Sequence, residues 1–141
     1  MRILLMSTGR RVTLIQRLRQ TAAEMQLNLH ITGTEIYPWT PSLKFCDSYH
    51  MVAKTFSEKH LNQLEEIILN EKLDAVLPGN DYDLAFLQQV RTRPVWQSLK
   101  ILDAGANQGL FLSKSESADF FKSIKLKVPT IYKRPQDGQG T

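Results

Sequence analysis

Apolar runs alternate with amphipathic segments along most of the chain, and this alternation constrains the fold more than any other feature. Residues 2–7 form a near-continuous apolar run, which is typical of a strand buried on both faces of a sheet. From Val12 to Met25, apolar residues then recur at helical spacing. The pattern repeats, which predicts further strands at 30–35, 49–52, 74–78 and 100–103, and further helices at 57–68, 80–90 and 104–112. The chain therefore reads as an α/β protein.

Strands that are separated by helices form βαβ units, whose crossovers are right-handed and whose strands are parallel. We therefore predict a three-layer, Rossmann-like fold with a doubly wound, mainly parallel sheet of about five strands. Its first strand should be central and should neighbour the fourth strand. Trp39 and Trp96 both lie close to prolines, and we interpret them as packing anchors.

The last part of the chain resembles the start of a second domain. Ser113 and Glu116 form a Ser-x-x-Glu capping box, so a helix should begin there. Residues 128–131 have the pattern of a loop that enters a strand. One helix and the start of one strand are too little to fold alone. We therefore interpret 1–112 as one Rossmann-like domain and 113–141 as a linker helix followed by the beginning of a truncated domain.

Composition excludes several classes of function. No apolar run approaches the ~20 residues of a membrane-spanning helix, so no membrane partner is expected. The net charge is +4, but the cations are spread along the sequence and are not interleaved with aromatic residues, so nucleic acid is not expected either. Cys46 is the only cysteine, which fits a reducing cytoplasm. The three histidines have no metal-like spacing, so we expect no metal site.

In a doubly wound sheet, ligands bind beyond the carboxyl ends of the strands, where the strand order switches. The loop after the first strand reaches this edge; its backbone N–H groups and two arginines favour an anion, although a tight turn with solvated arginines explains the same residues. Its candidate substrate-binding residues are Ser7, Thr8, Gly9, Arg10 and Arg11. With a single glycine, the loop lacks the G-x-G-x-x-G dinucleotide fingerprint.

Two further loops should reach the same edge. Glu35 ends the second strand, where a carboxylate can accept from a ribose hydroxyl or a substrate amine, or can simply be solvated. The loop after the fourth strand contributes Gly79, Asn80 and Asp81 as candidate substrate-binding residues. Asn80 or Asp81 should also cap the following helix, a role that is compatible with ligand contact. We assign no catalytic residue in the chain.

Four segments together resemble the N-terminal, pre-ATP-grasp domain of ATP-grasp ligases, and most closely the branch that is similar to the large subunit of carbamoyl phosphate synthase. They are the strand and Gly-Arg-Arg turn of 3–12, the acidic strand end and Cys-Asp-Ser-Tyr segment within 34–49, the Pro-Gly-Asn-Asp loop of 77–84, and the helix and Val-Pro entry of 112–130. Their order and spacing cover nearly the whole chain. The chain departs from the family pattern at Ser113, where the family has Asp, and at Lys127, where it has Gly.

The resemblance implies a function. The family joins a carboxylate to an amine, or to a similar nucleophile, through an acyl phosphate made from ATP and Mg²⁺. This chain would be the substrate-binding N-terminal domain, and Lys114 would match the lysine that approaches the ATP phosphates. The metal-binding carboxylates of the family would lie beyond Thr141. The full-length protein would then be an enzyme, whereas this fragment alone would bind ATP and Mg²⁺ poorly and catalyse nothing. A homo-oligomer is compatible with this interpretation.

Two other hypotheses belong to different functional classes. The chain could be a stand-alone Rossmann-like domain that binds a nucleotide or small anion, or a non-catalytic interaction domain. The length of the natural reading frame separates these from the ligase hypothesis, which requires about 150–200 residues, a domain's worth, beyond Thr141.

Overall fold

The computed structural model describes residues 1–103, 105 and 113–129. The chain divides into two compact units, residues 1–103 and 104–141, which we describe separately. Apart from Gly105, the helix predicted over 104–112 lies outside the described residues, as do the domain boundary predicted at 112 and the strand that should begin near 130.

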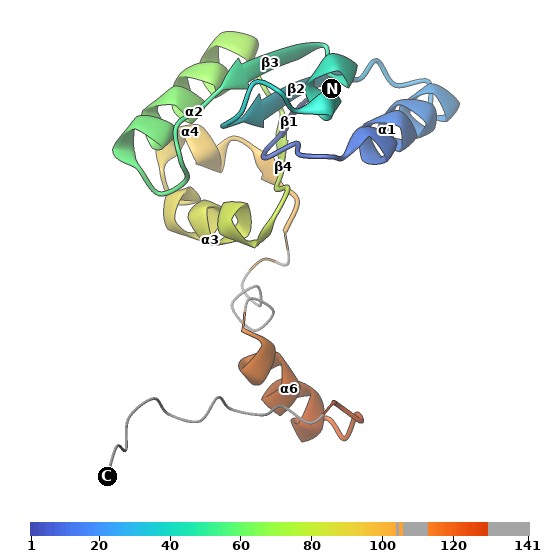
Figure 1. Ribbon diagram of the computed structural model, residues 1–141, viewed down its shortest axis with the longest axis vertical. Coiled ribbons are helices and arrows are strands. Elements are labelled where there is room, and N and C mark those ends of the chain that lie inside the picture. Colours follow the sequence, from blue (N-terminus) through green and yellow to red (C-terminus); the bar gives the residue numbers. More distant parts are fainter. Residues whose placement is uncertain (104, 106–112, 130–141) are drawn as a thin grey trace. The chain divides into compact units, whose positions relative to one another are not determined.

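The first unit is built on a five-stranded sheet with the order β3-β2-β1-β4-β5 (Figure 1). Every neighbouring pair is parallel. The strands are β1 (Arg2–Leu5), β2 (His30–Glu35), β3 (Ser48–Met51), β4 (Ala75–Leu77) and β5 (Lys100–Ile101). The predicted α/β fold class is confirmed, including the central position of β1 and its pairing with β4. The strand order switches beside β1, as a doubly wound sheet requires.

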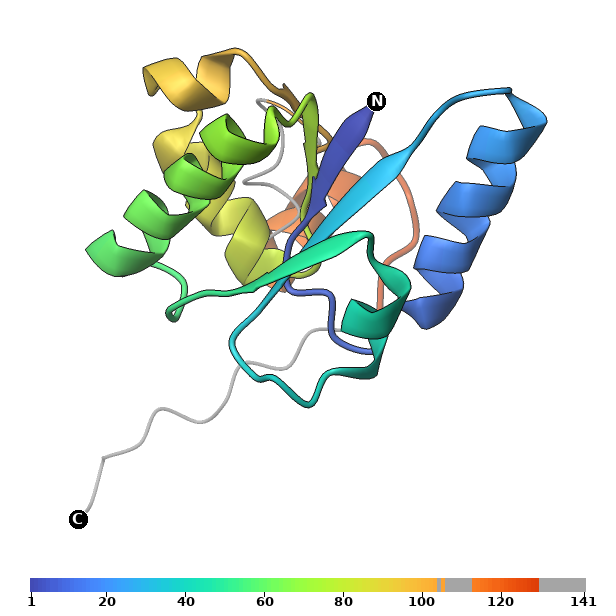
Figure 2. The same ribbon diagram turned by 90° about the horizontal axis from the view of Figure 1, so that it is seen from above.

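Helices cover both faces of this sheet. Figure 2 shows α1 on one face and α2, α3 and α4 on the other. Their bounds are α1 (Val12–Glu24), α2 (Glu58–Glu71), α3 (Asp81–Val90) and α4 (Pro94–Gln97), and a short 3-10 helix, η1, spans Pro41–Phe45. Neither α4 nor η1 was predicted from the sequence.

Successive residues along β1 and just after it belong alternately to two separate cores. This alternation explains why the sequence of β1 is continuously apolar. Leu4 and Met6 belong to the core on the side of α2–α4, together with Val76 and Trp96. Ile3 and Leu5 belong to the smaller core that contains residues of α1, β2 and β4. Because successive side chains of a strand point to opposite faces, a strand covered on both faces must be apolar at every position.

Side-chain caps begin the helices where the sequence predicted them. Ser57 Oγ accepts from the backbone N–H of His60 at 3.1 Å and caps α2. Asn80, not Asp81, caps α3, because its Oδ1 accepts from the N–H of Asp83 at 3.0 Å. Such caps satisfy N–H groups that have no partner within the helix.

The two tryptophans have different environments. Trp96 is fully buried and donates to Glu65 Oε1 at 3.0 Å, which confirms it as a packing anchor. The same interpretation of Trp39 is wrong, because this side chain is 90% exposed. Trp39 lies in the loop between β2 and η1, next to Pro38, where neither core cluster reaches it.

The second unit contains α6 (Lys114–Ser123). Ser113 Oγ accepts from the N–H of Glu116 at 3.3 Å, which confirms the predicted cap. Lys114 is exposed in the first turn of this helix. Within the described ranges, no helix has the length and apolar character needed to cross a membrane.

Candidate functional site at the carboxyl edge of the sheet

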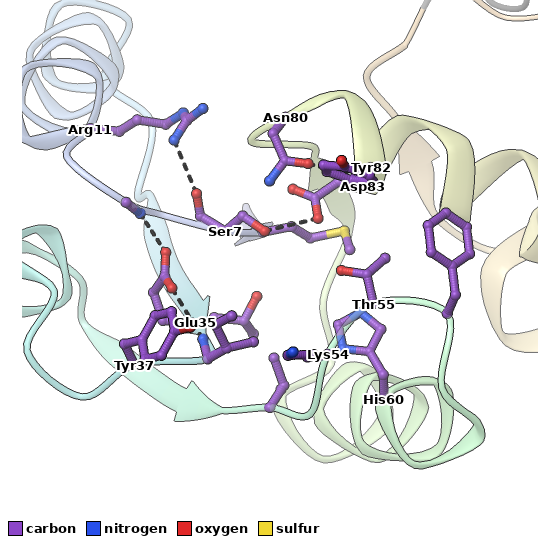
Figure 3. Close-up of a pocket in the computed structure, with 16 residues that line it drawn as sticks. Ser7, Arg11, Glu35, Tyr37, Lys54, Thr55, His60, Asn80, Tyr82 and Asp83 are labelled. Atoms are coloured by element: carbon purple, nitrogen blue, oxygen red, sulfur yellow. Dashed lines mark hydrogen bonds between the residues drawn. The ribbon is translucent and has the colours of Figure 1, made fainter. Parts of the chain in front are cut away.

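The loops that follow β1, β2, β3 and β4 line one cleft of about 700 Å³ at the carboxyl edge of the sheet (Figure 3). The loop at 7–11 and the loop at 78–83 lie side by side, as predicted, because β1 and β4 are neighbours and Ser7 Oγ bonds Asp83 Oδ1 at 2.9 Å. The lining comprises Met6, Ser7, Gly9, Arg11, Thr34, Glu35, Ile36, Tyr37, Val52, Lys54, Thr55, Phe56, His60, Asn80, Tyr82 and Asp83.

Arg11 ties two of these loops together. Its guanidinium donates to the carbonyl of Ser7 at 3.1 Å and also to the carbonyl of Gly79. A Cβ on Gly79 would lie 2.6 Å from the Ser7 carbonyl oxygen, so only glycine permits this approach of the two loops. The positive charge of Arg11 therefore serves first as a clamp between backbone carbonyls.

The carboxylate of Glu35 accepts a hydrogen bond from a backbone N–H group in the loop after β1. Its Oε1 accepts from the N–H of Gly9 at 2.6 Å, and its Oε2 accepts from the N–H of Ile36 at 3.1 Å. A carboxylate of the protein thus meets the loop's preference for an anion. This contact makes the loop a poorer site for an external phosphate than the sequence suggested.

Asp83 lies fully buried in the wall of the cleft. It accepts from Ser7 Oγ and from the N–H of Gly79, both at 2.9 Å. Burial raises the pKa of the Asp83 carboxyl, and the hydrogen bonds from Gly79, Ser7 and Asn80 offset that effect only in part. Asp83 therefore holds the two loops together and brings a poorly compensated negative charge to the cleft.

His60 belongs to the first turn of α2 and is 3% exposed. Its Nδ1 lies 2.8 Å from the carbonyl oxygen of Ala53, and its ring makes an edge-to-face contact with Phe86 at 5.0 Å between centroids. Burial lowers the pKa of the His60 imidazole, against the opposing effects of the Ala53 carbonyl and Asp83. Burial therefore favours the neutral imidazole over the charged one.

The structure gathers some of the predicted residues in the cleft and separates others from it. Ser7, Gly9, Arg11, Glu35 and Asn80 line it. Thr8 is buried outside the lining, Arg10 and Asp81 are exposed outside it, and Gly79 contributes the carbonyl that Arg11 contacts. Lys114 belongs to the other unit.

Sequence analysis missed the contribution of the loop after β3 and of Asp83. The lining residues that it did not single out as candidate contacts include Tyr37, Lys54, Thr55, His60, Tyr82 and Asp83. Residues 52–56 follow a parallel strand and reach the same edge as the other three loops, which was the signal available in the sequence.

Two other kinds of chemistry find no support in the described part of the chain. No group of three or more His, Cys, Asp or Glu side chains there could hold a metal ion. Burial raises the pKa of the Cys46 thiol to about 11, so at neutral pH this cysteine is not a thiolate nucleophile.

Comparison with known proteins gives a family and a fold. Residues 3–102 match the model of the PylC-like N-terminal domain. None of the curated proteins matches the sequence. Among solved structures, the chain is similar to N5-carboxyaminoimidazole synthetase from Staphylococcus aureus complexed with ADP, with a TM-score of 0.63 and 18% identity over 90% of this chain and 30% of that chain.

Two further solved structures share the fold. The phosphoribosylaminoimidazole carboxylase ATPase subunit from Aquifex aeolicus has a TM-score of 0.59 and 12% identity over 92% of this chain and 35% of that chain. The biotin carboxylase subunit of pyruvate carboxylase has a TM-score of 0.58 and 15% identity over 89% and 28%, respectively. The chain thus spans about a third of the length of these proteins or less.

Proposed function

This chain belongs to the family of PylC-like N-terminal domains, and on that premise we propose that it is the substrate-binding domain of an ATP-dependent ligase that joins a carboxylate to an amine. Its fold is that of the pre-ATP-grasp domain, as the resemblance in sequence predicted. The observation that carries the proposal is the cleft of about 700 Å³, in which four loops of the sheet meet at the switch in strand order.

Lys54 is the cation of the cleft that suits the carboxylate substrate. The guanidinium of Arg11 is engaged by two carbonyl groups, whereas no ion pair among the described residues involves the exposed Lys54. An ammonium on a flexible stem can follow a carboxylate as a point charge. We assign Lys54 to the acid substrate for this reason.

ATP with Mg²⁺ would supply the phosphoryl group that activates this carboxylate. Following the resemblance in sequence, we place Mg²⁺ and most ATP contacts in other parts of a longer, cytoplasmic enzyme. Lys114 would approach the ATP phosphates from the first turn of α6, where its side chain is exposed.

The stand-alone nucleotide- or anion-binding hypothesis has less support from the cleft. Gly9 already donates its N–H to Glu35, and Arg11 already donates to two carbonyl groups. A phosphate would have to displace these contacts. We therefore propose no second function.

The test uses the protein encoded by the complete natural reading frame. Repeated formation of ADP from ATP should require both an acid and an amine, as a screen of small carboxylates and amines would measure, because the acid alone forms the acyl phosphate and releases ADP only once until an amine displaces the phosphate. Lys54→Ala should raise the KM for the acid about tenfold, because a charge-assisted hydrogen bond contributes about 1.5–3 kcal/mol. Lys59→Ala is the matched control, since Lys59 is an exposed lysine outside the cleft lining. A reading frame that ends at Thr141, or ADP formation that ignores both substrates, would overturn the proposal.

A second test separates the ligase proposal from the stand-alone domain. In the full-length protein, Lys114→Ala should weaken ATP binding without unfolding the first unit, because Lys114 belongs to the second. Calorimetric titration of residues 1–141 with ATP should give no saturable heat. Tight binding of ATP by this chain alone would favour the stand-alone nucleotide-binding domain instead.

A further inference from the structure

His60 has one ring nitrogen whose role is fixed and one whose partner is missing. The carbonyl oxygen of Ala53 can only accept a hydrogen bond, so Nδ1, 2.8 Å away, must carry the proton. In the neutral ring, Nε2 is then an acceptor with a lone pair. The two nitrogens point in widely different directions, so Nε2 does not face Ala53.

This acceptor is buried and has no hydrogen-bond partner among the described residues. The other buried side-chain atom in that condition is Thr8 Oγ1, but Thr8 does not line the cleft, whereas His60 does. Figure 3 shows the imidazole beside Thr55, in the wall of the cleft where the loop after β3 leads into α2. Native proteins rarely leave a buried acceptor unpaired, and such atoms often mark a place where a ligand completes the site.

The charges around this nitrogen favour a positively charged donor. Asp83 interacts electrostatically with His60, and its carboxylate lies buried in the same wall. The rest of the lining carries one more carboxylate, Glu35, and two cations: Arg11, held by the carbonyls of Ser7 and Gly79, and the exposed Lys54, which no ion pair of the described residues neutralises. Asp83 is the charge that acts on His60, and a neutral acceptor near a buried carboxylate suits an ammonium N–H better than an anion or an uncharged apolar group.

We infer that Nε2 of His60 accepts a hydrogen bond from the ammonium group of the cleft's ligand and thereby selects an amine. The inference rests on the proposed function, and it assigns the amine of the ligation reaction to the wall formed by His60 and Asp83. His60 is then a positioning residue for the amine, while Lys54 holds the acid.

The test is a nitrogen-15 NMR titration of the histidine rings in residues 1–141. The probes are methylammonium chloride, which donates N–H, and tetramethylammonium chloride, which has the same charge but no N–H. We expect the Nε2 signal of His60 to report an unprotonated nitrogen in the chain alone and to move saturably with methylammonium only. His30 and His50, which contact Glu71 away from the cleft, provide internal controls in the same spectra.

His60→Asn assigns the signal and tests for a purely structural role. Asn can keep an N–H donor for Ala53 but has no acceptor at the position of Nε2. We expect this variant to stay folded but to unfold at a lower urea midpoint than the parent, because it removes buried ring atoms that pack on Phe86, and to lose the methylammonium response of the Lys54–His60 segment in backbone amide spectra. A proton on Nε2 in the chain alone, no response to methylammonium, or equal responses to both probes would overturn the inference. Because no ATP or second substrate is used, these outcomes are independent of whether the full-length protein is a ligase.

Discussion

The pKa values of two carboxylates in this fold are shifted in opposite directions. Glu71 is partly buried, and Asp83 is fully buried. Glu71 ends α2 and accepts from Thr32 Oγ1 at 2.6 Å, from Ser48 Oγ at 2.8 Å and from His50 Nε2 at 2.5 Å. Burial alone would raise the pKa of Glu71, but the bonds from His50, Thr32 and Ser48 together lower it to about 2. At Asp83 the effect of burial exceeds that of the hydrogen bonds, and the pKa of the carboxyl is raised.

The difference separates a carboxylate whose charge is fully paired from one whose surroundings are only partly paired. Glu71 also pairs with Arg2 at 3.4 Å, so its charge has both donors and a cation nearby. No ion pair among the described residues involves Asp83, and its neighbour His60 has an unpaired nitrogen. A saturated polar cluster has little left to offer a ligand, whereas an unsaturated one in a cleft can still gain hydrogen bonds.

The largest effect should come from removing the saturated carboxylate. Glu71→Ala should lower the free energy of unfolding by about 3 kcal/mol, because it breaks several hydrogen bonds at once, one of them to a cation. Urea denaturation of residues 1–141 measures this. Glu66→Ala on the exposed side of the same helix is the control and should change the midpoint little. Equal midpoints for the two variants would show that the Glu71 cluster does not stabilise the fold.

Titration with acid should show that the contributions of Glu71 and Asp83 to stability depend on pH in opposite directions. Glu71 has a depressed folded-state pKa, so its contribution is complete above about pH 4.5 and should be lost as the pH falls towards 2. Asp83 has a raised folded-state pKa, so its contribution to stability should instead increase as the pH falls through that value towards the ordinary 3.8. Unfolding measured from pH 6 to about pH 2.5 in Glu71→Gln and Asp83→Asn should therefore show slopes displaced in opposite directions from the parent. Displacement in the same direction would contradict the comparison.

Asp83→Asn should destabilise the chain less than Glu71→Ala does, by about 1–2 kcal/mol at pH 7. One amide oxygen cannot replace two carboxylate oxygens that accept from Ser7 and Gly79, but the variant also removes a poorly solvated charge. Urea midpoints give the stability, and the methylammonium titration gives the effect on the cleft. We expect weaker binding of the cation in this variant, which a mere loop contact would not explain.

Ser7→Ala should have the smallest effect, about 1 kcal/mol, because it removes one hydrogen bond to Asp83. The N–H of Gly79 still bonds that carboxylate, and Arg11 still joins the two loops through backbone carbonyls. Urea denaturation with Ser115→Ala as an exposed control would measure the difference. A loss as large as that of Glu71→Ala would mean that the cleft wall is as tightly organised as the Glu71 cluster.

Most of the fold could be predicted because each element carries its own local signal. Apolar runs gave all five strands within a few residues, and Ser57, Asn80 and Ser113 marked helix starts. The four-residue helix α4 has too few residues for a period, and the exposure of Trp39 depends on which elements surround it. Local pattern does not contain that information.

The site was harder to predict because its members come together only through sheet pairing. His60 and Lys54 reach the cleft because β3 pairs with β2 in the parallel sheet; the predicted strand indicated the edge that this loop reaches, but no local pattern shows which of its side chains line the cleft. Asp83 did carry a signal: Phe86, Leu87 and Val90 are buried at three, four and seven positions beyond it, so Asp83 had to lie on the buried face of α3. Asp81 lies on the exposed side, although the two residues have the same chemistry.

At Gly79 the two loops of the cleft approach each other closely, so the groups that hold the loops differ from the exposed side chains that a ligand would meet first. Main chain meets main chain between the ends of β1 and β4, and Arg11 and Asp83 bond the same two loops, so the width of the opening depends on these contacts and not on the exposed tyrosines of the lining. Tyr37 and Tyr82 are 62% and 71% exposed there, and replacing them should change what enters without moving the loops. Related domains of this family can in this way acquire new ligands by exchanging exposed lining residues, and the same positions are the natural ones to vary in engineering.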